Sequence, residues 1–411
     1  MFSYSCYYTF LIFINMKLAL FFICVLFILF EHVLKSQTLS ENSEISIITL
    51  GPYQGELYSA FGHSAFRVFD PANNWDIIYN YGAFSFNQPN FYLNFALGKP
   101  FYKLRLERFD SFQNYAIQEN RRIVQQILNL EKEDKQILFD FLQWNAEPEN
   151  SSYYYNYIYD NCATKIRDVL DSVFKDRIYF NYSFVKEDLT FRQLMDLYLQ
   201  EQPWGNLGID LCLGTGIDKI ASGYHYMFIP DYIEIAMGGA KIDIGSKERE
   251  LISDTVILNN HNPEPSSAGL ITPQIVFIII LLIVIMISIM DIKRKKLTPM
   301  VDTILFSIVG IVGWFLLFLW LFTEHISENN YNLIWALSIH FPIALILLKK
   351  PGTKFQNIYF LSTAIILCLL LILWNLVSQN MHESLIPIIL TLLVRSIVII
   401  VIRREGYKIL K

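Results

Sequence analysis

The stretch that most constrains the fold is "YIYDNCATKI", residues 157–166, in which a cysteine follows an Asp-Asn pair. Apolar residues then recur at the spacing of one helix face: Ile166, Val169, Leu170 and Val173. Asp160 or Asn161 is a good N-cap for this helix, because a short polar side chain satisfies free backbone N–H groups. The sequence therefore places Cys162 in the first turn of a helix, where the helix dipole favours a thiolate.

The composition divides the chain into a polar and an apolar part. Of the 411 residues, 53% are hydrophobic, which is too many for an ordinary soluble protein. Residues 38–258 have the composition of a soluble domain, whereas residues 271–402 are a series of apolar runs. The polar stretch 259–270 is a predicted linker between them. A net charge of −5 gives no reason to expect a nucleic-acid partner.

Five apolar runs are long enough, or nearly so, to cross a membrane: 273–290, 303–322, 333–348, 357–377 and 385–402. The segments after the first, third and fifth runs are basic: 291–296, 349–354 and the tail 403–411. The other two, 323–330 and 378–384, contain no Lys or Arg. Because basic loops stay in the cytoplasm, this alternation predicts that residues 38–258 lie outside the cytoplasm.

The N-terminus predicts the same orientation. Lys17 precedes the apolar run 18–30, and small or polar residues follow it, as in a signal peptide or a signal anchor. The predicted segment is residues 1–37, with Met16 as an alternative start to Met1. Either form exports the domain that follows it.

Two of the five cysteines fall in the exported domain, Cys162 and Cys212. Exported cysteines often pair in a disulfide, so this alternative stays open. A catalytic cysteine would instead need a nearby base, which is usually a histidine. The exported part offers three histidines, of which the last lies in the linker: His63, His225 and His261.

His63 is the best placed of these histidines. It lies in "SAFGHSAFRVFD" (59–70), which predicts a strand from about residue 63 to 69, and "DIIYNYGAF" (76–84) reads as the next strand. A base on a strand that faces a cysteine at a helix start is the arrangement of papain-like enzymes. Such a base needs a polar group to orient it, and Asn80 is our candidate. The alternative is a half-buried histidine with no chemical role.

Two polar residues fall inside predicted spans. Arg395 lies mid-way along the last span, and His340 lies in the third. A cation inside a membrane is costly without a partner, so Arg395 is a candidate for holding a lipid phosphate. The alternative is a hydrogen bond inside the helix bundle, which also accounts for His340.

Five sequence blocks occur in an order that resembles a known family: "FGHSAFRVFDP" (61–71), "YNYGAFSFNQPNFYLNFALGKPFYKL" (79–104), "ILNLEKEDKQIL" (127–138), "YYNYIYDNCATKIRDVL" (154–170) and "PWGNLGIDLCLGTGIDK" (203–219). Together they look like the exported domain of the DUF4105/Lnb family, which is associated with the lipoprotein N-acyltransferase of Bacteroidota. The C-terminal half looks like the Lnb-type membrane domain. The resemblance covers about residues 40–402.

The resemblance implies a circularly permuted papain-like fold, akin to NlpC/P60 and lecithin–retinol acyltransferase relatives, in which the histidine precedes the cysteine. It implies Cys162 as nucleophile and His63 as general base. Its motifs do not fix a third catalytic residue, so Asn80 remains our own assignment. Backbone N–H groups at the helix start, with Asn161, are the expected oxyanion hole. We expect an α+β exported domain followed by an all-α, five-span membrane domain.

The implied reaction is acyl transfer on the periplasmic side of the bacterial cytoplasmic (inner) membrane. The expected donor is a phospholipid, the acceptor is the N-terminal amine of a diacylated lipoprotein, and the acyl chain passes through a thioester on Cys162. Neither a metal nor a soluble cofactor is needed. Two alternatives remain: a papain-like cell-wall peptidase or amidase, and a non-catalytic membrane sensor with a Cys162–Cys212 disulfide. The membrane domain argues against the first, because a cell-wall enzyme needs only a tether.

Overall fold

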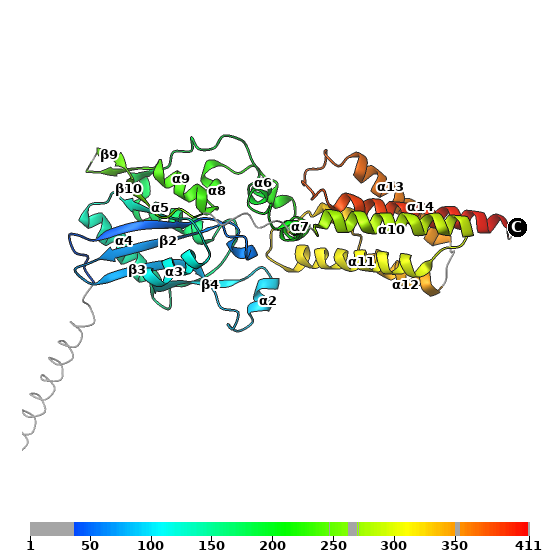
Figure 1. The fold of residues 1–411 in the computed structure, drawn as a ribbon, viewed down its shortest axis with the longest axis horizontal. Coiled ribbons are helices and arrows are strands. Elements are labelled where there is room, and N and C mark those ends of the chain that lie inside the picture. The colour runs from blue at the N-terminus through cyan, green and yellow to red at the C-terminus, as the bar shows by residue number, and fades with distance from the viewer. Residues whose placement is uncertain (1–36, 246, 262–268, 270, 350–353, 410–411) are drawn as a thin grey trace, which may run out of the picture.

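The computed structural model describes residues 37–245, 247–261, 269, 271–349 and 354–409. Figure 1 shows an elongated molecule, with a sheet-rich part at one end and long helices at the other. This element order confirms the expected α+β exported part followed by a helical membrane part. The predicted signal segment lies outside the described residues, apart from Gln37.

A seven-stranded antiparallel sheet forms the centre of the exported part, in the order β10-β5-β1-β2-β3-β4-β6. Its strands are β1 (Glu44–Leu50), β2 (His63–Asp70), β3 (Trp75–Ala83), β4 (Phe101–Arg108), β5 (Ile123–Leu128), β6 (Ser152–Tyr154) and β10 (Ile252–Asn259). A small second sheet contains β7 (Ile178–Tyr179), β8 (Lys241–Ile244) and β9 (Lys247–Glu250). The strands predicted near residues 63–69 and 76–84 are confirmed as β2 and β3. The papain-like permutation stays a prediction.

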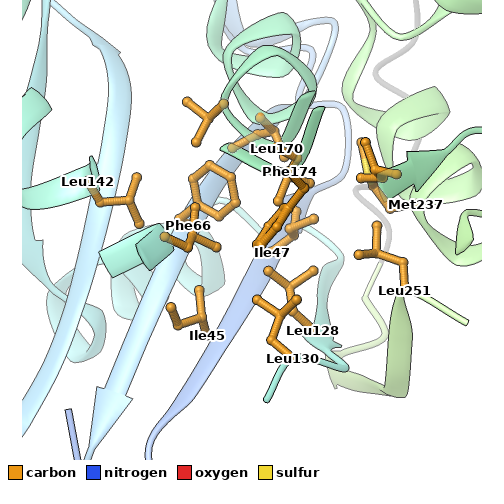
Figure 2. Close-up of a cluster of buried hydrophobic side chains, with 14 of the residues drawn as sticks. Ile45, Ile47, Phe66, Leu128, Leu130, Leu142, Leu170, Phe174, Met237 and Leu251 are labelled. Atoms are coloured by element: carbon orange, nitrogen blue, oxygen red, sulfur yellow. The ribbon is translucent and has the colours of Figure 1, made fainter. Parts of the chain in front are cut away.

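Helices cover both faces of the large sheet. One face carries α4 (Lys132–Ala146), α5 (Cys162–Phe174) and α9 (Pro230–Gly238), and the other carries α3 (Phe109–Gln118). Figure 2 shows the core beneath α5, where Leu170 and Phe174 lie near Phe66 and Ile47 of the sheet. Burying an apolar side chain of this size stabilises a fold by about 1.5–3 kcal/mol. This core therefore fixes α5, which begins at Cys162, against β1 and β2.

Short helices complete the exported part: α2 (Phe91–Ala96), α6 (Phe191–Asp196), α7 (Pro203–Cys212) and α8 (Gly223–Tyr226), with 3-10 turns η1 (Leu57–Ser59), η2 (Lys175–Arg177) and η3 (Thr215–Ile217). In Figure 1, α2, α6 and α7 lie on the side of the exported part that is nearest to the membrane helices. They connect the core to the membrane part.

The described residues of the membrane part contain four helices long and apolar enough to cross a membrane: α10 (Pro273–Arg294), α11 (Pro299–Phe322), α13 (Lys354–Ile372) and α14 (Leu385–Ile409). The third predicted span, 333–348, is not one of them, so the described residues do not confirm five continuous spans. This segment contains the end of a 3-10 turn, η4 (Tyr331–Ile334), and the ten-residue helix α12 (His340–Lys349). A helix of that length covers about 15 Å, or half of the hydrocarbon core.

Pro342 explains the break in this segment. Proline lacks an N–H group and clashes with the carbonyl four residues earlier, so a helix tolerates it only in the first turn. The backbone before α12 is covered by protein, because Ala336 and His340 are fully buried. His340 Nδ1 also forms an internal hydrogen bond with the Tyr359 hydroxyl, at 2.5 Å. The alternation of basic loops still requires this segment to cross, and that crossing stays a prediction.

The exported part docks on the outer loops of the membrane part around α7. Arg192 is fully buried there, and its guanidinium donates to Asp210 at 2.7 Å and to Asp218 at 2.9 Å. From the membrane part, Asn332 donates to the Asp210 carbonyl at 3.2 Å, and Gln379 donates to the carbonyl that follows α7 at 3.1 Å. The linker is therefore not the only connection between the two parts.

Arg395 lies inside the helix bundle and is fully buried. Its Nε donates to Asp302 of α11 at 2.6 Å, one Nη donates to Asp291 of α10 at 3.0 Å, and the other Nη donates to Ser288 at 3.0 Å. Both carboxylates lie near the basic loop between α10 and α11, on the side away from the exported part. This placement corrects the lipid-phosphate hypothesis, because Arg395 joins three helices far from the outer surface.

Replacing Arg395 with leucine should destabilise the membrane part. Arg395→Leu leaves two buried carboxylates without their partner, and breaking a buried ion pair costs about 3–5 kcal/mol. We expect a lower melting temperature of the full-length protein in detergent, and partial recovery in Arg395→Leu/Asp291→Asn/Asp302→Asn, which leaves no buried charge. A single variant that melts like the unmodified protein would contradict the packing role.

Candidate active site

Cys162 is the first residue of α5, and Asn161 caps that helix. Asn161 Oδ1 accepts hydrogen bonds from the N–H groups of Ala163 and Thr164, both at 2.9 Å. Thr164 Oγ1 accepts one from the Asn161 N–H at 2.8 Å, which completes a capping box. The cap fixes the first turn of α5 and with it the position of Cys162, whose side chain is half-buried.

His63 begins β2 and lies beside Cys162. The helix α5 packs across β2, and the imidazole of His63 forms a hydrogen bond with the thiol. His63 Nε2 lies 2.7 Å from Asn80 Oδ1 on the neighbouring strand β3. The structure thus brings together the three residues that the sequence assigned to a nucleophile, a base and an orienting group. Their chemical roles stay predictions.

Glu107 of β4, which the sequence analysis did not single out, fixes the direction of these hydrogen bonds. Asn80 Nδ2 donates to Glu107 Oε1 at 2.5 Å. A carboxylate only accepts hydrogen bonds, so the Asn80 amide turns its oxygen toward His63. His63 Nε2 then donates its proton to Asn80, which leaves Nδ1 to accept the proton of the Cys162 thiol. The four side chains form one directed chain of hydrogen bonds.

Gly82 provides the space beside the sulfur. It has a φ of +87° and lies where the pairing of β3 with β4 is irregular, between Asn80 and Ala83. A Cβ at this position would lie 3.7 Å from Cys162 Cβ and 3.7 Å from the ring of Tyr155. Glycine tolerates this positive φ, and its missing side chain leaves room next to the thiol.

The Cys162–His63 pair favours its charged form. Burial raises the pKa of the Cys162 thiol, but the charge and hydrogen bond of His63 and the backbone N–H groups of Ser64 and Ala163 hold this pKa below the ordinary 9.0. Burial lowers the pKa of His63, but the charge and hydrogen bond of Cys162 raise it above 6.5 overall. These opposite shifts favour a thiolate next to an imidazolium.

Arg121 is a second neighbour that the sequence analysis did not single out. It is buried, its Nε donates to the Gly51 carbonyl at 2.9 Å, and one Nη donates to Glu119 at 3.3 Å. The other Nη has no hydrogen-bond partner among the described residues. The positive charge of Arg121 lowers the pKa of His63, and it also interacts with Cys162. Arg121 is therefore a candidate for stabilising negative charge near the sulfur.

The side chain of Asn161 has no free hydrogen-bond donor for an oxyanion. The expectation that this side chain belongs to the oxyanion hole is therefore corrected. Both amide protons go to backbone carbonyls, those of Tyr157 at 2.9 Å and Phe228 at 2.8 Å. Its oxygen serves the helix cap. The backbone N–H groups at the start of α5 stay a prediction, and the backbone N–H of Ser64, which hydrogen-bonds the sulfur, and the guanidinium of Arg121 are further candidates.

The other cysteine and histidines of the exported part have different surroundings. Cys162 and Cys212 are both free, which contradicts the proposed disulfide. Burial raises the pKa of Cys212 to about 11, which makes it a poor nucleophile. His225 forms a hydrogen bond with the hydroxyl of Ser222 at 2.8 Å, and His261 is exposed.

Comparison with known proteins covers most of the chain. Residues 31–196 match the Lnb N-terminal periplasmic domain, and residues 264–405 match the Lnb transmembrane domain. No curated protein and no solved structure matches it. The fold and these matches define a multi-pass membrane protein with a periplasmic domain. The chain belongs to the Lnb family, and this membership suggests a lipoprotein N-acyltransferase.

Removing His63 should move the reactivity of Cys162 to higher pH. The thiolate is the reactive form and is present above the pKa of the thiol, which His63 lowers. His63→Ala removes this effect, so the midpoint of Cys162 alkylation by iodoacetamide rises, and alkylation at pH 7 slows roughly tenfold or more. Mass spectrometry of the Cys162 peptide measures the rate. An unchanged pH profile would mean that His63 does not act on the thiol.

Glu107 should act through the orientation of Asn80. Glu107→Leu removes the acceptor that holds the Asn80 amide, so alkylation of Cys162 at pH 7 should slow roughly tenfold. Glu107→Gln keeps a carbonyl oxygen that accepts the same hydrogen bond, so it should react like the unmodified protein. Equal losses in both variants would point to the charge of Glu107 rather than to its hydrogen bond.

Proposed function

We propose that this protein moves an acyl chain from a phospholipid to the N-terminal α-amine of a diacylglyceryl-cysteine lipoprotein, through a thioester on Cys162. The site faces the periplasm from the bacterial inner membrane. The observation that carries the proposal is the chain of hydrogen bonds from Cys162 through His63 and Asn80 to Glu107, within the domain that matches the Lnb periplasmic model.

In the first half of the reaction, His63 Nδ1 holds the proton of the Cys162 thiol. The thiolate attacks the ester carbonyl carbon of the phospholipid, and the carbonyl oxygen becomes negatively charged. Hydrogen-bond donors near the sulfur, the Ser64 N–H and the Arg121 guanidinium, stabilise that charge. The ester C–O bond then breaks, the imidazolium returns its proton to the departing oxygen, and a lysophospholipid leaves.

In the second half, the α-amine of the lipoprotein attacks the thioester carbonyl carbon. His63 takes a proton from the nitrogen, the C–S bond breaks, and the amide product leaves. The sulfur departs as a thiolate beside an imidazolium, which is the state that the pKa shifts of Cys162 and His63 favour. The enzyme is thereby restored without any further reactant.

The docking of the exported part supports lipid substrates. Tyr157, in the same segment as Cys162, accepts a hydrogen bond at 3.3 Å from the backbone of Ile326 in the loop that follows α11. This contact ties the segment that carries Cys162 to the membrane part, which supports a site near the outer membrane surface, where both lipid-bearing substrates lie. Confinement to one surface makes the encounter close to unimolecular. A cell-wall peptidase, the alternative, has no use for this docking.

Two variants test the proposed function directly. Cys162→Ser removes the nucleophile, and His63→Ala removes the base, so each should lower lipoprotein N-acylation by roughly a hundredfold or more. Mass spectrometry of lipoprotein N-termini, in cells that depend on this protein for acylation, gives the readout. An acyl adduct on the Cys162 peptide should be found in the unmodified protein when the acceptor is absent.

Cys212→Ser is the matched control, since it removes the other exported thiol and should leave N-acylation unchanged. Normal acylation in the Cys162→Ser variant would exclude the thioester. Release of peptides from cell-wall fragments, without any change in lipoprotein N-termini, would favour the peptidase instead.

A further inference from the structure

A group of exposed apolar side chains lies on and just before α2. It consists of Phe86, Tyr92, Leu93 and Phe95, which are 57%, 73%, 57% and 54% exposed. Isolated exposed apolar residues are common, but four of them within ten residues form a patch that water disfavours. We call this group the α2 patch. It needs a partner that covers it.

The membrane part holds the α2 patch at the outer surface. The helix α11 ends at Phe322, and the residues that follow bind the end of α2: Glu324 N–H donates to the Leu97 carbonyl at 2.9 Å, and Lys99 pairs with the Glu324 carboxylate at 2.9 Å. A Cβ on Gly98 would lie 2.5 Å from the His325 nitrogen, so only glycine allows this close approach.

The end of α11 beside this contact is apolar and exposed, as expected of a surface that faces lipid. Leu321 and Phe322 are 62% and 69% exposed in the last turn of a helix that is apolar enough to cross the membrane. The α2 patch therefore lies at the level where hydrocarbon gives way to headgroups, and aromatic side chains favour that level. Figure 1 shows α2 on the side of the exported part that faces the membrane helices.

A row of aromatic rings leads from the α2 patch to the proposed nucleophile. The aromatic row consists of Phe95, Phe91, Phe84, Tyr102 and Tyr155, with neighbouring ring centroids 6.3, 5.7, 4.8 and 4.5 Å apart. Its inner end, Tyr155, lies with Cys162 against Gly82. The row is thus a continuous series of ring contacts from the α2 patch toward the sulfur, in which Phe91 is buried.

We propose that the α2 patch inserts into the outer leaflet of the membrane and that the aromatic row guides an acyl chain of a phospholipid to Cys162. The inference rests on the proposed function for the role of Cys162. The phospholipid is the lipid assigned to this path, because in the proposed function its ester donates the acyl chain, whereas the diacylglyceryl esters of the lipoprotein stay intact. The acceptor brings its amine. The patch and the row give the donor a path that stays out of water.

Photo-cross-linking tests the membrane contact without any need for catalysis. The full-length protein, with p-benzoylphenylalanine in place of Tyr92, is placed in vesicles of phosphatidylethanolamine and phosphatidylglycerol and irradiated. Tyr179 is the control position, because it is 48% exposed and belongs to the small sheet of β7, β8 and β9, whose strand β9 lies at the end away from the membrane helices (Figure 1). We expect a phospholipid adduct at position 92 and none at 179. Equal labelling, or none at 92, overturns the proposal.

Two aspartates introduced into the α2 patch test whether a phospholipid acyl chain reaches Cys162 through this patch. In Phe86→Asp/Tyr92→Asp, acyl transfer from vesicle phospholipid to Cys162 should fall at least about tenfold, because carboxylates resist insertion. Acetylation of Cys162 by p-nitrophenyl acetate, which is small and soluble, should be unchanged, as should both reactions in Tyr179→Asp. Unchanged transfer from phospholipid overturns the path. If the unmodified protein forms neither adduct, the proposed function fails, and the cross-link alone still decides the membrane contact.

Discussion

The hydrogen bond between the Cys162 thiol and the His63 imidazole is the contact on which the rest of the candidate site depends. It joins the first residue of α5 to the first residue of β2, so it exists only if the helix cap and the core beneath α5 are both formed. Burial disfavours a charge on either group alone, whereas the two charges stabilise each other. The packing of α5 on the sheet thus brings Cys162 and His63 together as a pair that favours the charged forms.

Local sequence signals predict the elements that carry three residues of this site: Cys162, His63 and Asn80. The start of α5 follows from a cap residue and helical periodicity, and the strands that carry His63 and Asn80 follow from alternation and the turn between them. Local signals do not predict that Glu107 and Arg121 belong to the site. The position of Glu107 depends on the pairing of β4 with β3, and that of Arg121 depends on the packing of the loop after α3. The irregular pairing at Gly82 has no local signature that fixes its register.

The membrane part shows the same limit of sequence reasoning. Hydropathy predicts the four long helices, because length and apolarity suffice for them. The third span that hydropathy predicts is not confirmed as one long helix: Pro342 lies in the first turn of α12, and neighbouring protein covers the backbone before it. Hydropathy also cannot tell whether the Arg395 guanidinium binds a lipid phosphate or a carboxylate of the protein. That choice depends on two aspartates that are distant in sequence, Asp291 and Asp302.

In the proposed reaction, a thioester on Cys162 has to react with an amine before it reacts with water, and the surroundings of the sulfur favour this order. Tyr153 and Tyr155 lie around Gly82 beside Cys162, and burial raises the pKa of both hydroxyls, so the rings stay neutral. A neutral aromatic wall admits little water. The amine of a lipoprotein, in contrast, is anchored at the membrane surface, where its effective concentration near the docked site is high. Selectivity for the amine would then come from confinement, without any contact to the peptide sequence of the acceptor.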